Sequence, residues 1–139
     1  MRMTRTVAWI CVLALGACAD APATSAAPAG GIVGTRWVGI VGAGADPRTL
    51  PRLEFVSASR LSGYTGCNML SGAWKMEGDE VRIGALAMTK RLCLGAEGET
   101  EKRFLAALGD GGRGRRVGER LVFTGPKGAR FEFEQAAAT

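Results

Sequence analysis

Residues 74–83, WKMEGDEVRI, place apolar side chains at every second position on both sides of a short turn signal. The apolar positions are Trp74, Met76, Val81 and Ile83, with charged residues between the members of each pair. Alternation of this kind buries one face of a strand and leaves the other in water. Glu77-Gly78-Asp79 in the middle is typical of a hairpin turn. The stretch therefore predicts two antiparallel strands.

The same period of two recurs along the chain on either side of this hairpin. Further runs are Leu53–Phe55, Leu121–Phe123 and Phe131–Phe133, with additional strands expected at Trp37–Val41 and Arg60–Thr65. Gly125-Pro126-Lys127-Gly128 supplies a second turn signal. Many short strands separated by turns favour an antiparallel meander. We therefore predict a mainly β domain, a small antiparallel barrel or rolled sheet.

One segment breaks the alternation and predicts a single short helix at about 97–108. Phe104, Leu105 and Leu108 follow helical spacing, acidic residues come early, and Gly109 follows the last of them. Acidic residues near the start and glycine after the end are typical of helix termini. We expect this helix to lie across one open end of the barrel and to bury Phe104 and Leu108.

The first seventeen residues form a secretory signal. Basic residues precede an apolar run from Val7 to Leu15, which is shorter than the ~20 residues that span a bilayer. Leu15-Gly16-Ala17-Cys18 resembles a bacterial lipobox, so Cys18 is the predicted lipidation site, where acyl chains such as palmitate would anchor the protein. Two or three acyl chains suffice for stable anchoring. The alternative is an ordinary signal peptide that is cut near Ala19.

Residues 18–31 form the predicted tether, because a segment rich in alanine and proline cannot bury a core. Ala19 occupies the second mature position, where aspartate retains lipoproteins in the inner membrane of Gram-negative bacteria. By that resemblance we expect the outer membrane, with the domain in the periplasm.

The charge of the mature chain is mildly basic. The whole chain has 18 Lys and Arg against 13 Asp and Glu; removing Arg2 and Arg5 with the signal leaves +3. No nucleic-acid partner is expected from this balance. A local concentration of arginines lies in a glycine-rich stretch, which we expect to be a solvated hairpin loop: Arg113, Arg115, Arg116 and Arg120. The functional alternative is a contact with anionic lipid or lipopolysaccharide phosphates.

The four cysteines divide by position. Cys11 leaves with the signal and Cys18 takes the lipid, so Cys67 and Cys93 remain as a pair in a compartment that permits disulfides. A structural disulfide is the favoured interpretation. A metal site or a redox pair is the alternative, but the chain has no histidine and neither cysteine belongs to a Cys-x-x-Cys motif.

Several motifs in order resemble the META domain, also called HslJ-like. They include Gly34-Thr35-Arg36-Trp37, Gly66-Cys67-Asn68 and Thr89-Lys90-Arg91-Leu92-Cys93. The resemblance covers residues 32–135, with 136–139 as a tail, and it implies a small antiparallel barrel with one helix. Other members often carry methionines between the threonine and the cysteine. Gly66, Asn68 and Thr89 are interpreted as a structural turn, with a ligand pocket as the alternative.

Catalysis is not expected. Without histidine, a Ser-His or Cys-His nucleophile is impossible. The carboxylate pairs Asp79/Glu80 and Glu97/Glu101 lie in a turn and in the predicted first helical turn, where solvation and capping explain them. We expect no cofactor and no metal.

The favoured function is a non-enzymatic envelope lipoprotein that binds another envelope component or supports the envelope under stress. The resemblance adds heat shock and antibiotic tolerance as contexts, and secretin pilots as a fold-level likeness. A carrier of a small apolar molecule is the second hypothesis, and a cavity above ~300 Å³ would favour it. A lysozyme or protease inhibitor is the third.

Overall fold

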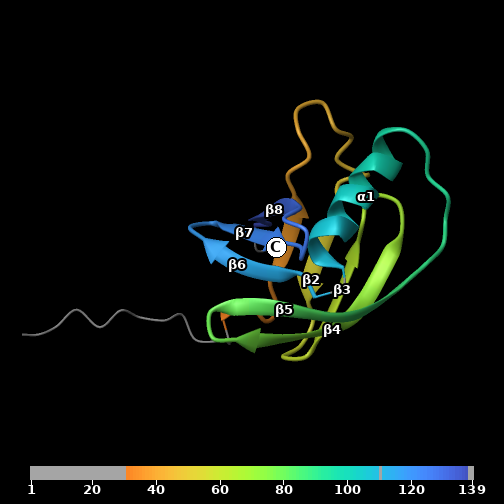
Figure 1. Cartoon of the computed structure of the whole chain (residues 1–139). Coiled ribbons are helices and arrows are strands. Elements are labelled where there is room, and N and C mark those ends of the chain that lie inside the picture. Colours follow the sequence, from red (N-terminus) through yellow and green to blue (C-terminus); the bar gives the residue numbers. More distant parts are fainter. Residues whose placement is uncertain (1–30, 110, 138–139) are drawn as a thin grey trace, which may run out of the picture.

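The computed structural model describes residues 31–109 and 111–137, which contain eight strands and one helix (Figure 1). In chain order these are β1 (Arg36–Gly39), β2 (Arg52–Phe55), β3 (Arg60–Tyr64), β4 (Met69–Glu77), β5 (Glu80–Met88), α1 (Ala96–Leu108), β6 (Arg113–Val117), β7 (Arg120–Thr124) and β8 (Arg130–Gln135). The predicted signal, most of the tether and Cys18 lie outside the described residues.

The strands form a closed barrel in which each strand pairs with the next and β8 returns to β1. Every pair is antiparallel, and the ring closes where Val38 of β1 lies opposite Glu134 of β8. Closure gives every strand two neighbours, although β5 pairs with β6 only over Glu80–Arg82, and it shortens the sheet edge that is open to strand-to-strand aggregation. The predicted mainly β barrel with a single helix is confirmed.

The hairpin that the alternation predicted is the longest ribbon of the barrel. Glu77 lies opposite Glu80 across the turn, and Trp74 lies opposite Ile83. The register shifts between Gly72 and Trp74, a bulge that bends the strand. Trp74, Val81 and Ile83 are buried as predicted, while Met76 is only partly buried against the core.

The barrel interior is filled by side chains from all around the ring. The bulky aromatic residues that compete for it are all buried: Trp37, Phe55, Trp74, Phe123, Phe131 and Phe133. Phe55 and Trp74 meet edge to face with ring centroids 4.8 Å apart, a favoured geometry for aromatic pairs. Small barrels are commonly packed in this way.

Helix α1 starts one residue before its predicted start and ends at the predicted Leu108. Glu97 and Glu99 occupy its first turn, where a carboxylate interacts favourably with the positive end of the helix dipole. Phe104 and Leu108 are buried, and Phe104 packs edge to face on Phe131. In Figure 1 the helix stands beside the start of β6 and the end of β7. No helix among residues 31–109 and 111–137 has the length and hydropathy needed to cross a membrane.

The predicted solvated hairpin loop is correct in that the four arginines are exposed on a hairpin, but it is wrong in that residues 113–117 form a strand. Arg113–Val117 forms β6, which pairs with β5 and β7. Its one interior residue is Gly114, opposite Phe123. A Cβ at Gly114 would lie 2.6 Å from the Phe123 ring, so the ring occupies the space of the missing side chain. This strand therefore lacks the apolar alternation that marks the others.

Candidate functional site

The Gly-Cys-Asn motif forms the corner between β3 and β4. Gly66 has a φ of 101°, a conformation that other residues rarely adopt, and a Cβ there would lie 3.1 Å from the carbonyl oxygen of Thr49. The Tyr64 hydroxyl donates a hydrogen bond of 3.0 Å to the Gly66 carbonyl. The predicted structural turn is thus present, and its glycine is required by both backbone geometry and space.

Asn68 uses both ends of its buried side-chain amide to hold the segment after β5. Only 3% of the residue is exposed. Its Oδ1 accepts hydrogen bonds from the Thr89 hydroxyl at 2.8 Å and from the Arg91 backbone N–H at 2.7 Å. Its Nδ2 donates to the Arg91 carbonyl at 3.0 Å. Thr89 in turn accepts from the backbone N–H of Met69 at 3.1 Å. One amide therefore fixes the course of the chain from Thr89 to Arg91.

Glu101 joins the same network from the helix. Its carboxylate accepts hydrogen bonds from the Thr65 hydroxyl and from Asn68 Nδ2, the latter at 3.0 Å. Thr65 also accepts from the backbone N–H of Asn68 at 2.8 Å. The interpretation of Glu101 as a first-turn capping residue is therefore wrong. Glu101 lies three residues before Phe104 and seven before Leu108, so helical spacing places it on the core-facing side.

The disulfide completes this corner. Cys67 and Cys93 are bonded, with Cα atoms 6.0 Å apart, so the pairing predicted from the cysteine count is present. In the described part of the chain, no buried side-chain nitrogen or oxygen lacks a hydrogen-bond partner. The "disulfide corner", by which we mean Thr65–Asn68, Thr89–Cys93 and Glu101, thus directs its buried polar groups at one another.

The four predicted anion-contacting arginines are not equivalent. Arg115 pairs with Glu80 at 3.1 Å, and Arg120 pairs with Glu132 at 2.9 Å. Arg116 donates to the Gln135 side chain at 3.2 Å and lies over the Trp37 ring. Arg113 forms no ion pair with any acidic side chain of the described residues. Arg113 and Arg115 line one surface hollow, which Arg116 and Arg120 do not line.

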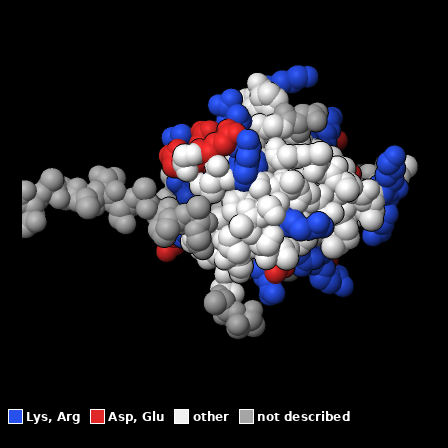
Figure 2. Space-filling view, turned by 90° about the horizontal axis from the view of Figure 1, so that it is seen from below, with Lys and Arg blue, Asp and Glu red and all other residues white. Residues whose placement is uncertain are grey.

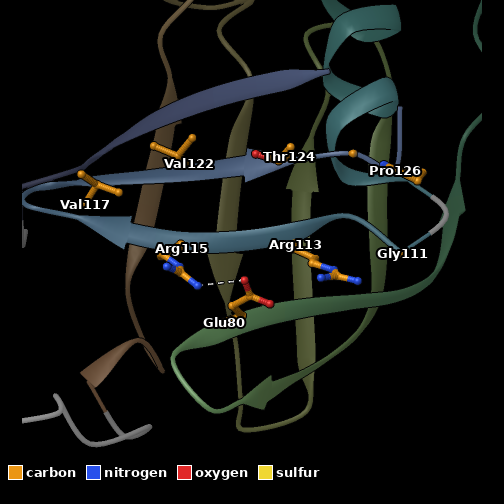
Figure 3. A pocket seen from close by; sticks show the side chains of 9 residues that line it. Glu80, Gly111, Arg113, Arg115, Val117, Val122, Thr124 and Pro126 are labelled. Atoms are coloured by element: carbon orange, nitrogen blue, oxygen red, sulfur yellow. Dashed lines mark hydrogen bonds and ion pairs between the residues drawn. The ribbon is translucent and has the colours of Figure 1, made fainter. Parts of the chain in front are cut away.

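A hollow of about 510 Å³ opens on the outer face of β5, β6 and β7. Arg113 and Arg115 form one side, Glu80 lies beside Arg115, and Val122, Thr124 and Pro126 lie across from them (Figure 3). The hollow thus combines a cation that has no described acidic partner with an apolar wall. Such a surface can receive an anionic group attached to an apolar body.

Charge elsewhere on the surface is dispersed. On the face that Figure 2 shows, Lys and Arg lie around the rim and also within the mostly uncharged central area, and most of the visible acidic side chains gather at one place. Among the residues that the structure describes, no three Cys, Asp or Glu side chains lie close enough to hold a metal ion.

Comparison with known proteins gives the family of this fold. The META domain profile matches residues 31–138. The chain belongs to the META domain family. No curated protein matches it. A protein from Burkholderia xenovorans, solved by NMR, is 19% identical with a TM-score of 0.60, over 79% of this chain and 87% of that one. A second NMR structure is 21% identical with a TM-score of 0.62, over 76% and 92%. At these identities the two structures show the shared fold alone.

The interior of this META domain barrel is filled by its own side chains. The hollow exceeds the ~300 Å³ that the carrier hypothesis required, but it lies outside the barrel and carries two arginines and a glutamate. The carrier hypothesis gains no apolar enclosure from it. Sequence reasoning missed Thr65 and Glu101 as partners of Asn68, although the position of Glu101 relative to Phe104 was a usable signal.

Proposed function

We propose that this META domain protein is a non-enzymatic lipoprotein of the cell envelope that supports envelope integrity by binding an anionic envelope component. The observation that carries the proposal is the open hollow on β5–β7, where Arg113 has no acidic partner among the described residues. The lipobox sequence Leu15-Gly16-Ala17-Cys18 supports the envelope location.

The chemistry of the hollow favours a phosphate-bearing amphiphile over a simple anion. Arginine presents several donors to phosphate oxygens. Arg115 forms an ion pair with Glu80 at 3.1 Å, while Arg113 has no acidic partner among the described residues. Val117, which is 59% exposed, and Pro126 supply apolar surface next to the two cations. A lipid phosphate with its acyl chains matches both features.

The test is complementation of a gene deletion under heat, detergent and hydrophobic antibiotics. We expect the deletion to sensitise cells and the unaltered gene to restore growth. An R113Q/R115Q variant should fold and yet restore growth poorly, because the cations of the hollow are lost. A C18S variant should also fail, because it removes the acylated thiol.

The matched control is an R60Q/K102Q variant, which removes the same charge from exposed positions outside the hollow. It should complement like the unaltered gene. The proposed function is refuted if the deletion strain survives all three stresses normally. If R113Q/R115Q complements fully, the envelope role stands without this site.

A further inference from the structure

Two leucines flank the disulfide in the segment between β5 and α1, and both face solvent. Leu92 is 89% exposed and Leu94 is 81% exposed. They lie on either side of Cys93, which is half-buried through its bond to Cys67. Single exposed apolar residues are common on protein surfaces, but two almost fully exposed leucines within three residues are unusual.

This segment is held in place rather than free to fold over the leucines. Cys93 is tied to Cys67, and the backbone N–H and C=O of Arg91 both bond to the buried Asn68 amide, at 2.7 and 3.0 Å. The backbone on the amino-terminal side of Leu92 is therefore fixed at Arg91, and the next residue is fixed by the disulfide. The exposure of the leucines is built into the fold.

Further apolar and cationic side chains surround the pair. Met69 is 58% exposed and Met88 is 37% exposed, and Met69 is bonded through its backbone to Thr89. Of eight large exposed apolar residues in the described ranges, four thus lie in the two segments that the disulfide joins. Lys90 and Arg91 are exposed, and neither forms an ion pair with a described acidic side chain.

We propose that the leucine loop, residues Met88–Gly95, inserts Leu92 and Leu94 into the interface of an anionic lipid bilayer. Proteins that bind at a membrane interface insert apolar side chains at the boundary between headgroups and acyl chains, while nearby Lys and Arg contact the anionic headgroups. Lys90 and Arg91, next to the leucines, supply the charge that such headgroups attract. A stable protein interface needs about 800 Å² per partner, whereas binding to a bilayer grows with the apolar area that inserts and with attraction to anionic lipids, so protruding side chains add to an existing anchor.

The inference goes beyond the proposed function, because the leucine loop does not include the residues of the hollow. It rests on the proposed envelope location only for the bilayer that the loop must be able to reach. Figure 1 shows the start of the described chain and the loop after β5 on opposite sides of the domain. A domain of this size is about 35 Å across, and the thirteen residues 19–31 extend to about 45 Å. A predicted tether of that length allows the loop to reach the bilayer that holds the anchor.

The experiment measures sedimentation of the chain from residue 19 onward with phosphatidylcholine vesicles that contain phosphatidylglycerol. All eight strands, the helix and the disulfide lie within residues 36–135, so this chain keeps them, and circular dichroism checks each variant. Leu92→Ser with Leu94→Ser should lower the partition coefficient about tenfold or more, given the apolar area removed. Val56→Ser, at a 55% exposed position elsewhere, is the control and should bind normally.

The charge contribution separates lipid insertion from other causes. Lys90→Gln with Arg91→Gln should weaken binding to the anionic vesicles at low salt and leave the weak binding to pure phosphatidylcholine unchanged. The inference is overturned if the unaltered chain binds no vesicles or if the leucine variant binds like the control. It is also overturned if only R113Q/R115Q abolishes binding, an outcome that would instead support the hollow as the lipid site.

A fluorescence measurement covers the case in which the serine variant fails to fold. Leu92→Trp places an indole on the loop, whereas Trp37 and Trp74 are buried. Its added emission should shift to the blue on anionic vesicles and be quenched by lipids brominated near the headgroup end of the chain. Emission that stays at the wavelength of exposed tryptophan would contradict insertion.

Discussion

The disulfide corner and the β6–β7 hairpin use polar residues in opposite ways. In the corner, Asn68 and Thr65 are buried and bond to Glu101, Thr89 and the backbone. On the outer face of the hairpin, Arg113 and Arg115 are exposed, and only Arg115 has an acidic partner among the described residues. Buried polar groups that satisfy one another rigidify a fold, whereas exposed charges cost little to change.

The two regions show that the residues of a recognisable motif need not be the residues that contact a ligand. The buried motif residues Thr65, Cys67 and Asn68 hold the chain together, and each buried side-chain nitrogen or oxygen of the described residues has a hydrogen-bond partner within the protein. The two proposed binding surfaces use exposed side chains instead, namely the arginines of the hollow and the leucines that the corner displays. Changes in the corner should therefore lower stability, while changes on the hairpin surface should alter binding alone.

The largest expected effect follows removal of the disulfide. A C67A/C93A variant should lose roughly 3.5 kcal/mol of unfolding free energy, the chain-entropy value for a loop of this length. Urea denaturation measures it. The R113Q/R115Q variant is the comparison and should lose less than about 0.5 kcal/mol, as exposed substitutions do. Equal losses in the two variants would remove the contrast between corner and hairpin.

Asn68→Ala should lower the free energy of unfolding by about 2–3 kcal/mol. The substitution leaves the Arg91 backbone N–H without its acceptor and removes the amide that donates to Glu101. The same denaturation assay measures it. Ser62→Ala, in β3 and without a side-chain hydrogen bond in this structure, is the control and should change stability little. A small loss for Asn68→Ala would mean that water replaces the amide, and the corner would then be less rigid than its bonds indicate.

Gly114→Ala should cost about 1–3 kcal/mol, the usual range for overpacking, because its Cβ would lie 2.6 Å from the Phe123 ring. Gly114 lies on the inner face of the β6–β7 hairpin, so a loss of stability here would show that only the outer face of this hairpin tolerates substitution. Gly84→Ala in β5 meets its nearest atom at 3.4 Å and is the control. In a double-mutant cycle, Phe123→Leu should reduce the cost of Gly114→Ala; additive losses would argue against the ring as the cause.

The smallest expected effect concerns the exposed charges on the hairpin of β4 and β5. Lys75 and then Arg82, through hydrogen bonds to its carboxylate, hold the pKa of Glu77 at about 2. A depressed folded-state pKa stabilises the protein above the unfolded-state value of about 4.3, and this contribution is lost as the pH falls toward 2. The stability difference between the unaltered chain and Glu77→Gln should thus shrink from pH 6 to pH 2. A difference that is constant with pH would contradict it.

Local patterns in the sequence were sufficient for most of the fold. The alternation around Trp74 and Ile83 gave the hairpin, the spacing of Phe104 and Leu108 gave the helix, and the count of cysteines gave the bonded pair. Each of these depends on which side of a segment is buried, and periodicity reports that directly. The lipobox prediction at Cys18 depends on local residues in the same way.

The tertiary structure alone decided the remaining features. Strand β6 was missed because Phe123, on the neighbouring strand, fills the place of a side chain at Gly114. The role of Glu101 depends on Thr65 and Asn68, which approach it only when the helix packs on the barrel. The pairing of Arg115 with Glu80 and the exposure of Leu92 and Leu94 likewise depend on which segments become neighbours. Sequence periodicity specifies the buried face of each strand, but contacts between strands are set by the register and closure of the whole barrel.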